Sequence, residues 1–260
     1  MSGFGPAEAR ALDAADPLAA FREQFHIPPG PDGKPAAYFC GNSLGLQPRG
    51  ARAALEQELD DWARFAVEGH FEARHPWYRY HEAFRAPLAR LVGATEREVV
   101  AMNSLTANLH FLMVSFYRPT RSRYRILIET PVFPSDLYAV QTQLRFHGFD
   151  PRDGLIQVGP RPGEPEVREA DIEAALAESG GLVALVLLSG VGYYNGQWFD
   201  MPRLVRAAHD AGALIGFDLA HAAGNVPLSL HDWDADFAAW CSYKYLNAGP
   251  GALAGAYPGG

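Results

Sequence analysis

Residues 182–188 read Leu-Val-Ala-Leu-Val-Leu-Leu, and this run decides the expected fold. Every residue in it is apolar, without the alternation that marks a strand with one face in water. A strand of this kind is buried on both faces, as in parallel sheets that carry helices on both sides. Residues 213–217, Ala-Leu-Ile-Gly-Phe, form a second such run. Together the two runs indicate the core of an α/β sheet.

Helices and strands alternate around these two runs. Apolar residues at helical spacing predict the helices, and short apolar runs between turn residues predict the strands. The expected helices cover residues 17–25, 51–67, 80–91, 104–117, 135–147, 171–178 and 201–211, and the expected strands cover residues 125–129, 182–188 and 213–217, with a strand-like segment at 251–258. This order predicts an α/β fold with a mainly parallel sheet covered by helices on both faces.

The chain is expected to divide into an arm and one large domain. We assign residues 1–50 to an N-terminal arm with a substrate-side segment and residues 51–260 to the large domain, because the first 35 residues are rich in Ala, Pro and Gly. Residues 151–168, dense in Gly and Pro, are expected to form a surface loop. Trp62 is expected to be a core or interface aromatic. The chain ends just after a strand-like segment, so we expect it to be cut short.

Composition describes an ordinary globular protein of 260 residues, 48% hydrophobic and 20% charged. The formal charge of −8, without a Lys/Arg run, gives no electrostatic reason to expect nucleic acid or anionic membrane as a partner. No apolar run approaches the ~20 residues of a membrane span, and the N-terminus has no apolar signal-peptide core. Cys40 and Cys241 alone exclude a disulfide scaffold or a Cys-based zinc site. We therefore expect a cytoplasmic protein with no bound metal.

The most informative single residue is Lys244, within Ala-Trp-Cys-Ser-Tyr-Lys-Tyr-Leu-Asn-Ala-Gly-Pro-Gly at residues 239–251. Among aromatic and small residues, burial disfavours the ammonium form of a lysine and favours the neutral amine. The neutral amine is the form that condenses with carbonyl groups. The alternative is a lysine that extends from a strand end into solvent.

Asp218 stands 26 positions before that lysine (244 − 218), directly after the strand 213–217. Ligands of open α/β sheets bind at this edge, and a carboxylate there can keep a ring nitrogen protonated, so that the ring accepts electrons. The alternative is a carboxylate that caps the next helix. His221 follows three residues later and, taken alone, is more often a structural histidine. Asp218 and Lys244, the latter in a Ser-x-Lys context, together indicate a pyridoxal-phosphate site of the aminotransferase-like class.

Five motifs, in order along the chain, make this similarity specific. They are Tyr-Phe-Cys-Gly-Asn-Ser-Leu-Gly-Leu-Gln-Pro at 38–48, Asn-Ser-Leu-Thr-Ala-Asn-Leu-His at 103–110, Phe-Pro-Ser-Asp at 133–136, Asp-Leu-Ala-His-Ala-Ala-Gly-Asn at 218–225, and Trp-Cys-Ser-Tyr-Lys-Tyr-Leu-Asn-Ala-Gly-Pro-Gly at 240–251. The set resembles the kynureninase family and spans nearly the whole chain. The resemblance implies the large, cofactor-binding domain of an aminotransferase-like fold.

The resemblance also implies roles for individual residues. Lys244 would hold pyridoxal phosphate covalently, Asp218 would pair with the pyridine nitrogen, and Tyr243 would contact the phosphate and transfer protons. Leu105 and Thr106 would bind the phosphate, and they open a helix whose N-terminus suits an anion. The remaining cofactor contacts implied are Phe133, Pro134, Ser135, Asp136, Ser189 and His221, and the substrate contacts implied are Ser43 and His70. Phe133 would stack on the pyridine face; its alternative is core packing.

The implied reaction is hydrolysis of L-kynurenine, or its 3-hydroxy form, to anthranilate or 3-hydroxyanthranilate and L-alanine. It would serve tryptophan catabolism and NAD biosynthesis in a homodimer. Because the family's smaller C-terminal domain, with its substrate-binding arginine, is absent, we expect this chain alone to be a poor enzyme. One alternative is a cysteine desulfurase, although such enzymes place His directly before the lysine, where Tyr243 stands. Another is a non-catalytic fragment that binds cofactor or a partner subunit.

Overall fold

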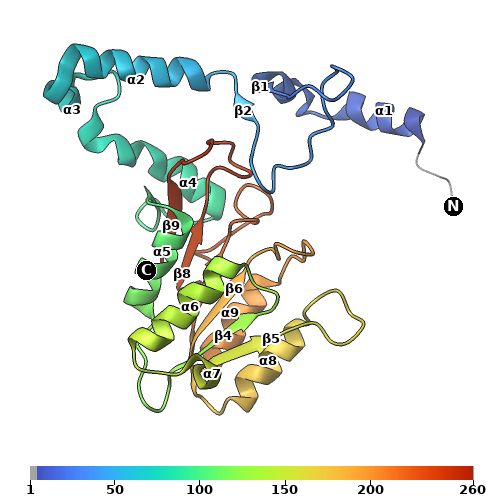
Figure 1. The fold of residues 1–260 in the computed structure, drawn as a ribbon, viewed down its shortest axis with the longest axis vertical. Helices are drawn as coiled ribbons and strands as arrows, with labels where there is room; N and C mark the ends of the chain where they lie inside the picture. Colours follow the sequence, from blue (N-terminus) through green and yellow to red (C-terminus); the bar gives the residue numbers. More distant parts are fainter. Residues whose placement is uncertain (1–4, 260) are drawn as a thin grey trace.

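The computed structural model describes residues 5–259, which are built around a seven-stranded sheet (Figure 1). Its strands, in spatial order, are β3 (Val100–Met102), β9 (Ala254–Pro258), β8 (Phe237–Trp240), β7 (Leu214–Asp218), β6 (Val183–Ser189), β4 (Arg125–Glu129) and β5 (Leu155–Val158). The five strands from β8 to β5 run parallel, and β9 is antiparallel to both of its neighbours. The predicted mainly parallel sheet is confirmed.

Alternate residues of the central strands enter two separate apolar cores. In β4, Ile126 and Ile128 pack on one side of the sheet and Leu127 on the other. One core is completed by α5 (Leu105–Phe116) and α6 (Pro134–Phe146), and the other by α4 (Arg85–Val92), α8 (Glu169–Glu178) and α9 (Met201–Asp210). The continuous apolar run at 182–188 is explained by this arrangement, because all seven residues of β6 are buried.

Several elements differ from those predicted. The segment 151–168 is not wholly a loop, since it contains α7 (Pro151–Gly154) and the edge strand β5. The strands β3 and β8 were not predicted, because runs of three and four residues carry little periodicity. The segment 17–25 forms the 3₁₀ helix η1 (Ala19–Gln24), preceded by an unpredicted helix, α1 (Pro6–Ala15).

The helix predicted at 80–91 is divided into the 3₁₀ helix η3 (Trp77–Phe84) and α4. Pro87 lies in the first turn of α4. Proline is tolerated in the first turn because the N–H groups there have no intrahelical partner, whereas farther along a helix it removes a hydrogen bond. An uninterrupted α-helix over the whole predicted segment is therefore disfavoured.

The N-terminal segment lies beside the sheet rather than over it (Figure 1). It comprises α1, η1, β1 (Phe25–His26), β2 (Gln47–Pro48), α2 (Ala51–Phe65), η2 (Ala66–Glu68) and α3 (Gly69–Glu72). The predicted helix at 51–67 corresponds to α2, but its apolar face is uncovered: Leu55, Leu59 and Trp62 are 67%, 59% and 65% exposed. Trp62 is therefore not a core residue of this chain. None of the helices within residues 5–259 is both long enough and apolar enough to span a membrane.

The segment between β2 and the preceding turn contacts the loop that follows β8 at Gly45. Its N–H donates to the carbonyl oxygen of Tyr243 over 2.8 Å. A Cβ atom at position 45 would lie 2.3 Å from the carbonyl oxygen of Lys244, so only glycine allows this approach. The motif Asn-Ser-Leu-Gly-Leu is thus placed against the loop that carries the predicted catalytic lysine.

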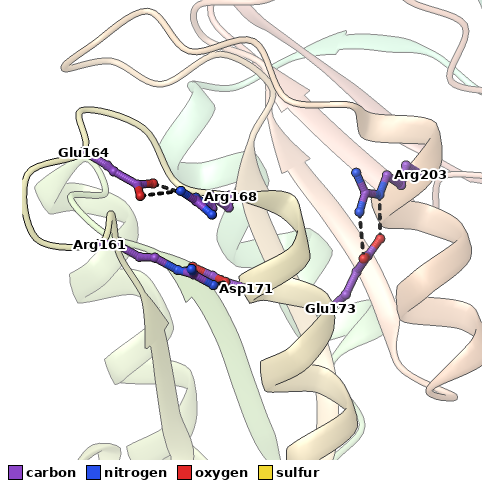
Figure 2. A network of polar contacts seen from close by, with 6 residues as sticks. All are labelled: Arg161, Glu164, Arg168, Asp171, Glu173 and Arg203. Carbon is purple, nitrogen blue, oxygen red and sulfur yellow. Dashed lines mark hydrogen bonds and ion pairs between the residues drawn. The ribbon is translucent and has the colours of Figure 1, made fainter.

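Ion pairs and a buried amide hold the loop before α8 and the adjoining helices, and Figure 2 shows the ion pairs. Arg161 pairs with Asp171, Arg168 with Glu164, and Arg203 of α9 with Glu173 of α8. Gln197 is buried, donates to the carbonyl oxygen of Val167 and accepts from its N–H. Exposed ion pairs contribute little energy each, so the buried amide is the stronger link between this loop and residues 190–199.

Candidate active site

Polar side chains lie at or just after the carboxyl ends of four parallel strands, β4, β6, β7 and β8. Glu129, Ser189 and Asp218 are the last residues of β4, β6 and β7, and Ser189 lies opposite Asp218 in the strand register. Lys244 follows four residues after the end of β8. Carboxyl ends of parallel strands meet at the same edge, which is where open α/β sheets bind their ligands.

A cavity opens at this edge of the sheet. It is lined by Leu105, Thr106, Phe133, Ser135, Ser189, Asp218, His221, Tyr243 and Lys244, all predicted from the sequence, and by Ser104, Val191, Tyr193 and Ala220, which were not. These residues come from segments that lie as much as 140 positions apart (244 − 104). The structure thus brings most of the predicted cofactor contacts into one space.

Lys244 points into this cavity. Its Nζ atom lies 2.9 Å from Nε2 of His221 and 5.9 Å from the centre of the Phe133 ring. Burial lowers the pKa of His221, and the neighbouring Lys244 lowers it further, against the opposing charge of Asp218. A neutral imidazole that carries its proton on Nδ1 presents Nε2 to the lysine as an acceptor.

Two buried carboxyl groups lie at the carboxyl edge of the sheet, Asp218 in the cavity lining and Asp136 close to it. Asp218 is 6% exposed, and its Oδ1 atom accepts a hydrogen bond from the N–H of Ala220 over 2.7 Å. The predicted alternative, a carboxylate that caps the following turn, therefore accounts for one of its two oxygens. Asp136, in the first turn of α6, is also buried, and burial together with the charge of Asp218 raises its pKa. A buried carboxylate at Asp218, without a basic hydrogen-bond partner among the described residues, favours a cationic ligand.

The start of α5 offers a site for an anion. Ser104 caps the helix, with its hydroxyl oxygen accepting from the N–H of Ala107. Asn103 adopts a left-handed conformation (φ 50°), and the buried Asn108 donates to the carbonyl oxygen of Met102 over 2.9 Å. These contacts fix the first turn, where the N–H groups of Leu105 and Thr106 begin the helix. Unpaired N–H groups and the helix dipole favour a phosphate there.

Two aromatic side chains complete the cavity wall. The Phe133 ring is 44% exposed, so the core-packing alternative is wrong. The edge of Tyr193 meets it at a centroid distance of 5.4 Å and an interplanar angle of 88°. Burial raises the pKa of the Tyr243 phenol, as does the neighbouring thiol of Cys241, so this phenol keeps its proton near neutral pH.

Four predicted residues do not line the cavity. Pro134 is the first residue of α6, and Asp136 lies beneath the wall, where its carboxylate accepts from the Ser135 hydroxyl over 3.2 Å. Ser43 is exposed in the segment that ends at Gly45. His70 is exposed on α3, in a groove with Phe71 and Tyr78. The substrate roles of Ser43 and His70 stay predictions.

Sequence reasoning missed Glu129 and Tyr193. Glu129 is buried at the end of β4, and its position was readable as a charged residue directly after the apolar run Ile126–Ile128. Tyr193 follows the buried strand β6 by four residues, on the ligand-binding edge. Both lie where the rule for open α/β sheets places ligand contacts.

The donor set fits pyridoxal phosphate. It offers a lysine amine, a buried aspartate for a ring nitrogen, an exposed aromatic face and a helix N-terminus for a phosphate. Within residues 5–259, no group of three or more His, Cys, Asp or Glu side chains is arranged to hold a metal ion.

Comparison of the sequence with known proteins identifies the family of the chain. Residues 38–255 match the family described as Aminotransferase class-V. The chain is 57% identical to a kynureninase from Myxococcus xanthus, over 96% of this chain and 58% of that protein. It is 51% identical to a kynureninase from Nematostella vectensis, over 95% of this chain and 55% of that protein. The chain thus spans a little over half the length of these relatives.

Solved structures share the fold at much lower identity. A cysteine desulfurase from Escherichia coli superposes with a TM-score of 0.71 at 21% identity, over 94% of this chain and 58% of that one. A variant of C-DES with glycine covalently linked to its PLP cofactor superposes with a TM-score of 0.72 at 19% identity, over 92% of this chain and 59% of that one. At such identities the likeness establishes the fold alone.

Proposed function

Because the chain belongs to the class-V aminotransferase family, we propose that it binds pyridoxal phosphate at the carboxyl edge of its sheet and forms the cofactor-binding part of a kynureninase. The reaction would be hydrolysis of L-kynurenine or 3-hydroxy-L-kynurenine to anthranilate or 3-hydroxyanthranilate and L-alanine. The observation that carries this proposal is identity of 51–58% to kynureninases over about 95% of the chain, cavity included.

Each part of the cofactor has a matching group in the cavity. Lys244 would hold the aldehyde carbon through its amine, and Asp218 would hold the ring nitrogen in its protonated form. The N–H groups of Leu105 and Thr106 would bind the phosphate, with Phe133 against the ring. When bound, pyridoxal phosphate withdraws electrons from the carbon atoms next to the substrate amine.

The chain's own residues would handle the protons. Lys244, once free of the cofactor, would remove the proton from the substrate α-carbon, and His221 accepts a hydrogen bond from its amine at 2.9 Å. Tyr243, which lines the same cavity, would donate a proton, because its raised pKa keeps the phenol protonated. Burial and the charge of Asp218 raise the pKa of Asp136, which favours the neutral form of that carboxyl group.

A cysteine desulfurase is the weaker alternative. It is favoured by the fold likeness alone, at 19–21% identity. Tyr243 stands where those enzymes are expected to carry His. The identity to kynureninases is more than twice as high and spans the same residues.

We also infer a homodimer. The uncovered face of α2, with Leu55, Leu59 and Trp62, is an apolar surface of the kind that associates with protein. A role in tryptophan catabolism and NAD biosynthesis, with a small amino acid as substrate and a cytoplasmic location, completes this proposal. We further propose the division at residue 50 between a substrate-side arm and the large domain.

Two measurements test the function. Titration of the 260-residue chain with pyridoxal phosphate is expected to give a new absorbance band near the edge of the visible range. Addition of L-kynurenine is then expected to release fluorescent anthranilate, slowly from this chain and faster from a protein of the full length of its relatives. Absence of the absorbance band would contradict the cofactor assignment, and binding without anthranilate release from the longer protein would contradict the reaction.

A further inference from the structure

Glu129 makes a contact that none of the roles above uses. It is buried at the end of β4, and its Oε1 atom accepts two hydrogen bonds from Ser189, from the N–H over 3.1 Å and from the hydroxyl over 2.5 Å. Its Oε2 atom is buried without a hydrogen-bond partner among residues 5–259. The Oε1 atom of the buried Glu129 thus accepts hydrogen bonds only from Ser189, and Ser189 lines the cavity.

This contact fixes the polarity of Ser189. A serine hydroxyl has one proton to donate and two lone pairs with which to accept. Because the proton is directed at Glu129, Ser189 presents only lone pairs to the cavity. A ligand group that meets Ser189 must therefore be a donor, and phosphate or carboxylate oxygens are disfavoured there.

The surroundings of Glu129 favour the neutral form of its carboxyl group. Burial is the largest influence and raises its pKa, the two hydrogen bonds from Ser189 oppose this, and the charge of Asp218 raises it again. In the neutral form Oε2 carries the proton and Oε1 remains a carbonyl acceptor. A glutamine amide in the same place would offer the same acceptor with the same shape.

We propose that Glu129 is a positioning residue that holds the Ser189 hydroxyl as a hydrogen-bond acceptor for a donor group on bound pyridoxal phosphate. Glu129 itself touches no ligand and acts through Ser189. This inference rests on the proposed cofactor site. It adds that Ser189 accepts, and the cofactor donates, the hydrogen bond between them.

The test is the affinity of the chain for pyridoxal phosphate, measured by absorbance titration in four variants. Ser189→Ala removes the acceptor, and Glu129→Leu frees the hydroxyl to rotate and donate into the cavity or to water. Each is expected to weaken binding about tenfold, the size of one lost hydrogen bond. The double variant is expected to be no weaker than either single one, because both changes remove the same contact. Glu129→Gln is expected to bind within about twofold of the wild type.

Matched controls separate this role from general destabilisation. Ser179 is also a buried serine, whose hydroxyl donates to the carbonyl oxygen of Leu176; it precedes the first residue of β6, whereas Ser189 is the last residue of that strand. Ser179→Ala is expected to leave the affinity unchanged. If Glu129→Leu does not fold, infrared difference spectra between wild type and Glu129→Gln replace it: the wild type is expected to show the carbonyl band of a protonated carboxylic acid, lost in the variant and shifted in Ser189→Ala.

The outcomes are distinguishable. The positioning role would be overturned if the losses of affinity in the two single variants multiplied in the double variant, or if Glu129→Gln lost affinity tenfold. Either result would leave the proposed cofactor site intact. A band of an ionised carboxylate, unmoved by Ser189→Ala, would overturn it as well. Failure of the wild-type chain to bind pyridoxal phosphate would overturn the proposed function and this inference with it.

Discussion

The carboxyl edge of the sheet and the helix α2 depart from the usual distribution of side chains in opposite directions. At the sheet edge, the carboxyl groups of Glu129, Asp136 and Asp218 are buried together. On α2, Leu55, Leu59 and Trp62 face solvent. Burial of a carboxyl group and exposure of a contiguous apolar stripe both cost free energy.

The two regions differ in the kind of partner that would remove this free-energy cost. A cationic, hydrogen-bonding ligand would remove it at the sheet edge, since a buried carboxylate is stabilised by an opposite charge. An apolar protein surface would remove it on α2. The sheet edge is therefore expected to bind a cationic ligand, and α2 is expected to bind an apolar protein surface. The four predictions below test these two expectations.

The largest effect is expected from Lys244→Ala. Loss of the amine should abolish the covalent link to pyridoxal phosphate and reduce anthranilate production by the longer protein at least about 10³-fold. The chain has two lysines, so Lys34→Ala is the matched control and should change neither property. Borohydride reduction followed by peptide mass mapping measures the link; label on Lys34 in the wild type would contradict the assignment.

Asp218→Asn tests the charge at the sheet edge. Asparagine keeps the cap on Ala220 through its carbonyl oxygen but cannot hold a ring nitrogen in its protonated form. Turnover of L-kynurenine by the longer protein is expected to fall about 100-fold, comparable to loss of one electrostatic contact in an active site. Near wild-type turnover with an unchanged cofactor spectrum would show that the buried carboxylate serves folding alone.

Trp62→Glu tests the apolar stripe. If α2 is covered in a dimer, burial of this side chain contributes about 1.5–3 kcal/mol, and its loss should weaken association roughly 10- to 100-fold. Sedimentation velocity over a concentration series measures the change. Asp60→Ser, on the polar face of the same helix, is the control. A monomeric wild type at all concentrations, or equal effects of the two variants, would exclude this face as the interface.

The smallest effect is expected from Asp136→Asn in the chain without cofactor. Because the folded state raises the pKa of Asp136, it binds that proton more tightly than the unfolded chain does, and the wild type loses stability as pH rises above about 4. Asparagine avoids this loss. The free energy of unfolding of the variant should therefore exceed that of the wild type by at least about 1.4 kcal/mol at pH 8, and the two should be equal near pH 4. Denaturant unfolding at both pH values measures it.

Asp171→Asn is the control, because the expected change in stability has the opposite sign. The Arg161 guanidinium lowers the pKa of the exposed Asp171, so that its contribution is present above the usual aspartate range and is lost as pH falls. Removal of this carboxylate should therefore slightly destabilise the chain at pH 8. A stabilising effect of both substitutions would point to a general reduction of negative charge instead.

Much of the fold was predictable because long apolar patterns are locally encoded. The buried run of β6 and the spacing in α9 predicted a doubly covered sheet, and the structure confirms it. The short strands β3 and β8 were not predictable, since their pairing energy comes from neighbours distant in sequence. Segment 155–158 was taken for a loop for the same reason: its strand identity depends on pairing with β4.

The candidate site divides in a similar way. Residues whose chemistry is rare, such as a lysine among aromatics or an aspartate after an apolar strand, were identified in sequence and line the cavity. Glu129 also follows an apolar run, but it was missed because its contact with Ser189, 60 positions along the chain, exists only in the folded structure. Tyr193 was missed because aromatic residues near strand ends are usually packed in the core.

The sequence by itself determined the covered parallel sheet, the amphipathic nature of α2 and the chemical identity of the lysine and aspartate, because periodicity and residue type are properties of neighbouring positions. The tertiary structure alone decided that Nζ of Lys244 lies beside His221, that three carboxyl groups are buried near one another at the sheet edge, and that the apolar face of α2 is left uncovered. These are distances between segments far apart in the chain, and desolvation and charge act through space. Such effects arise only after the chain has folded.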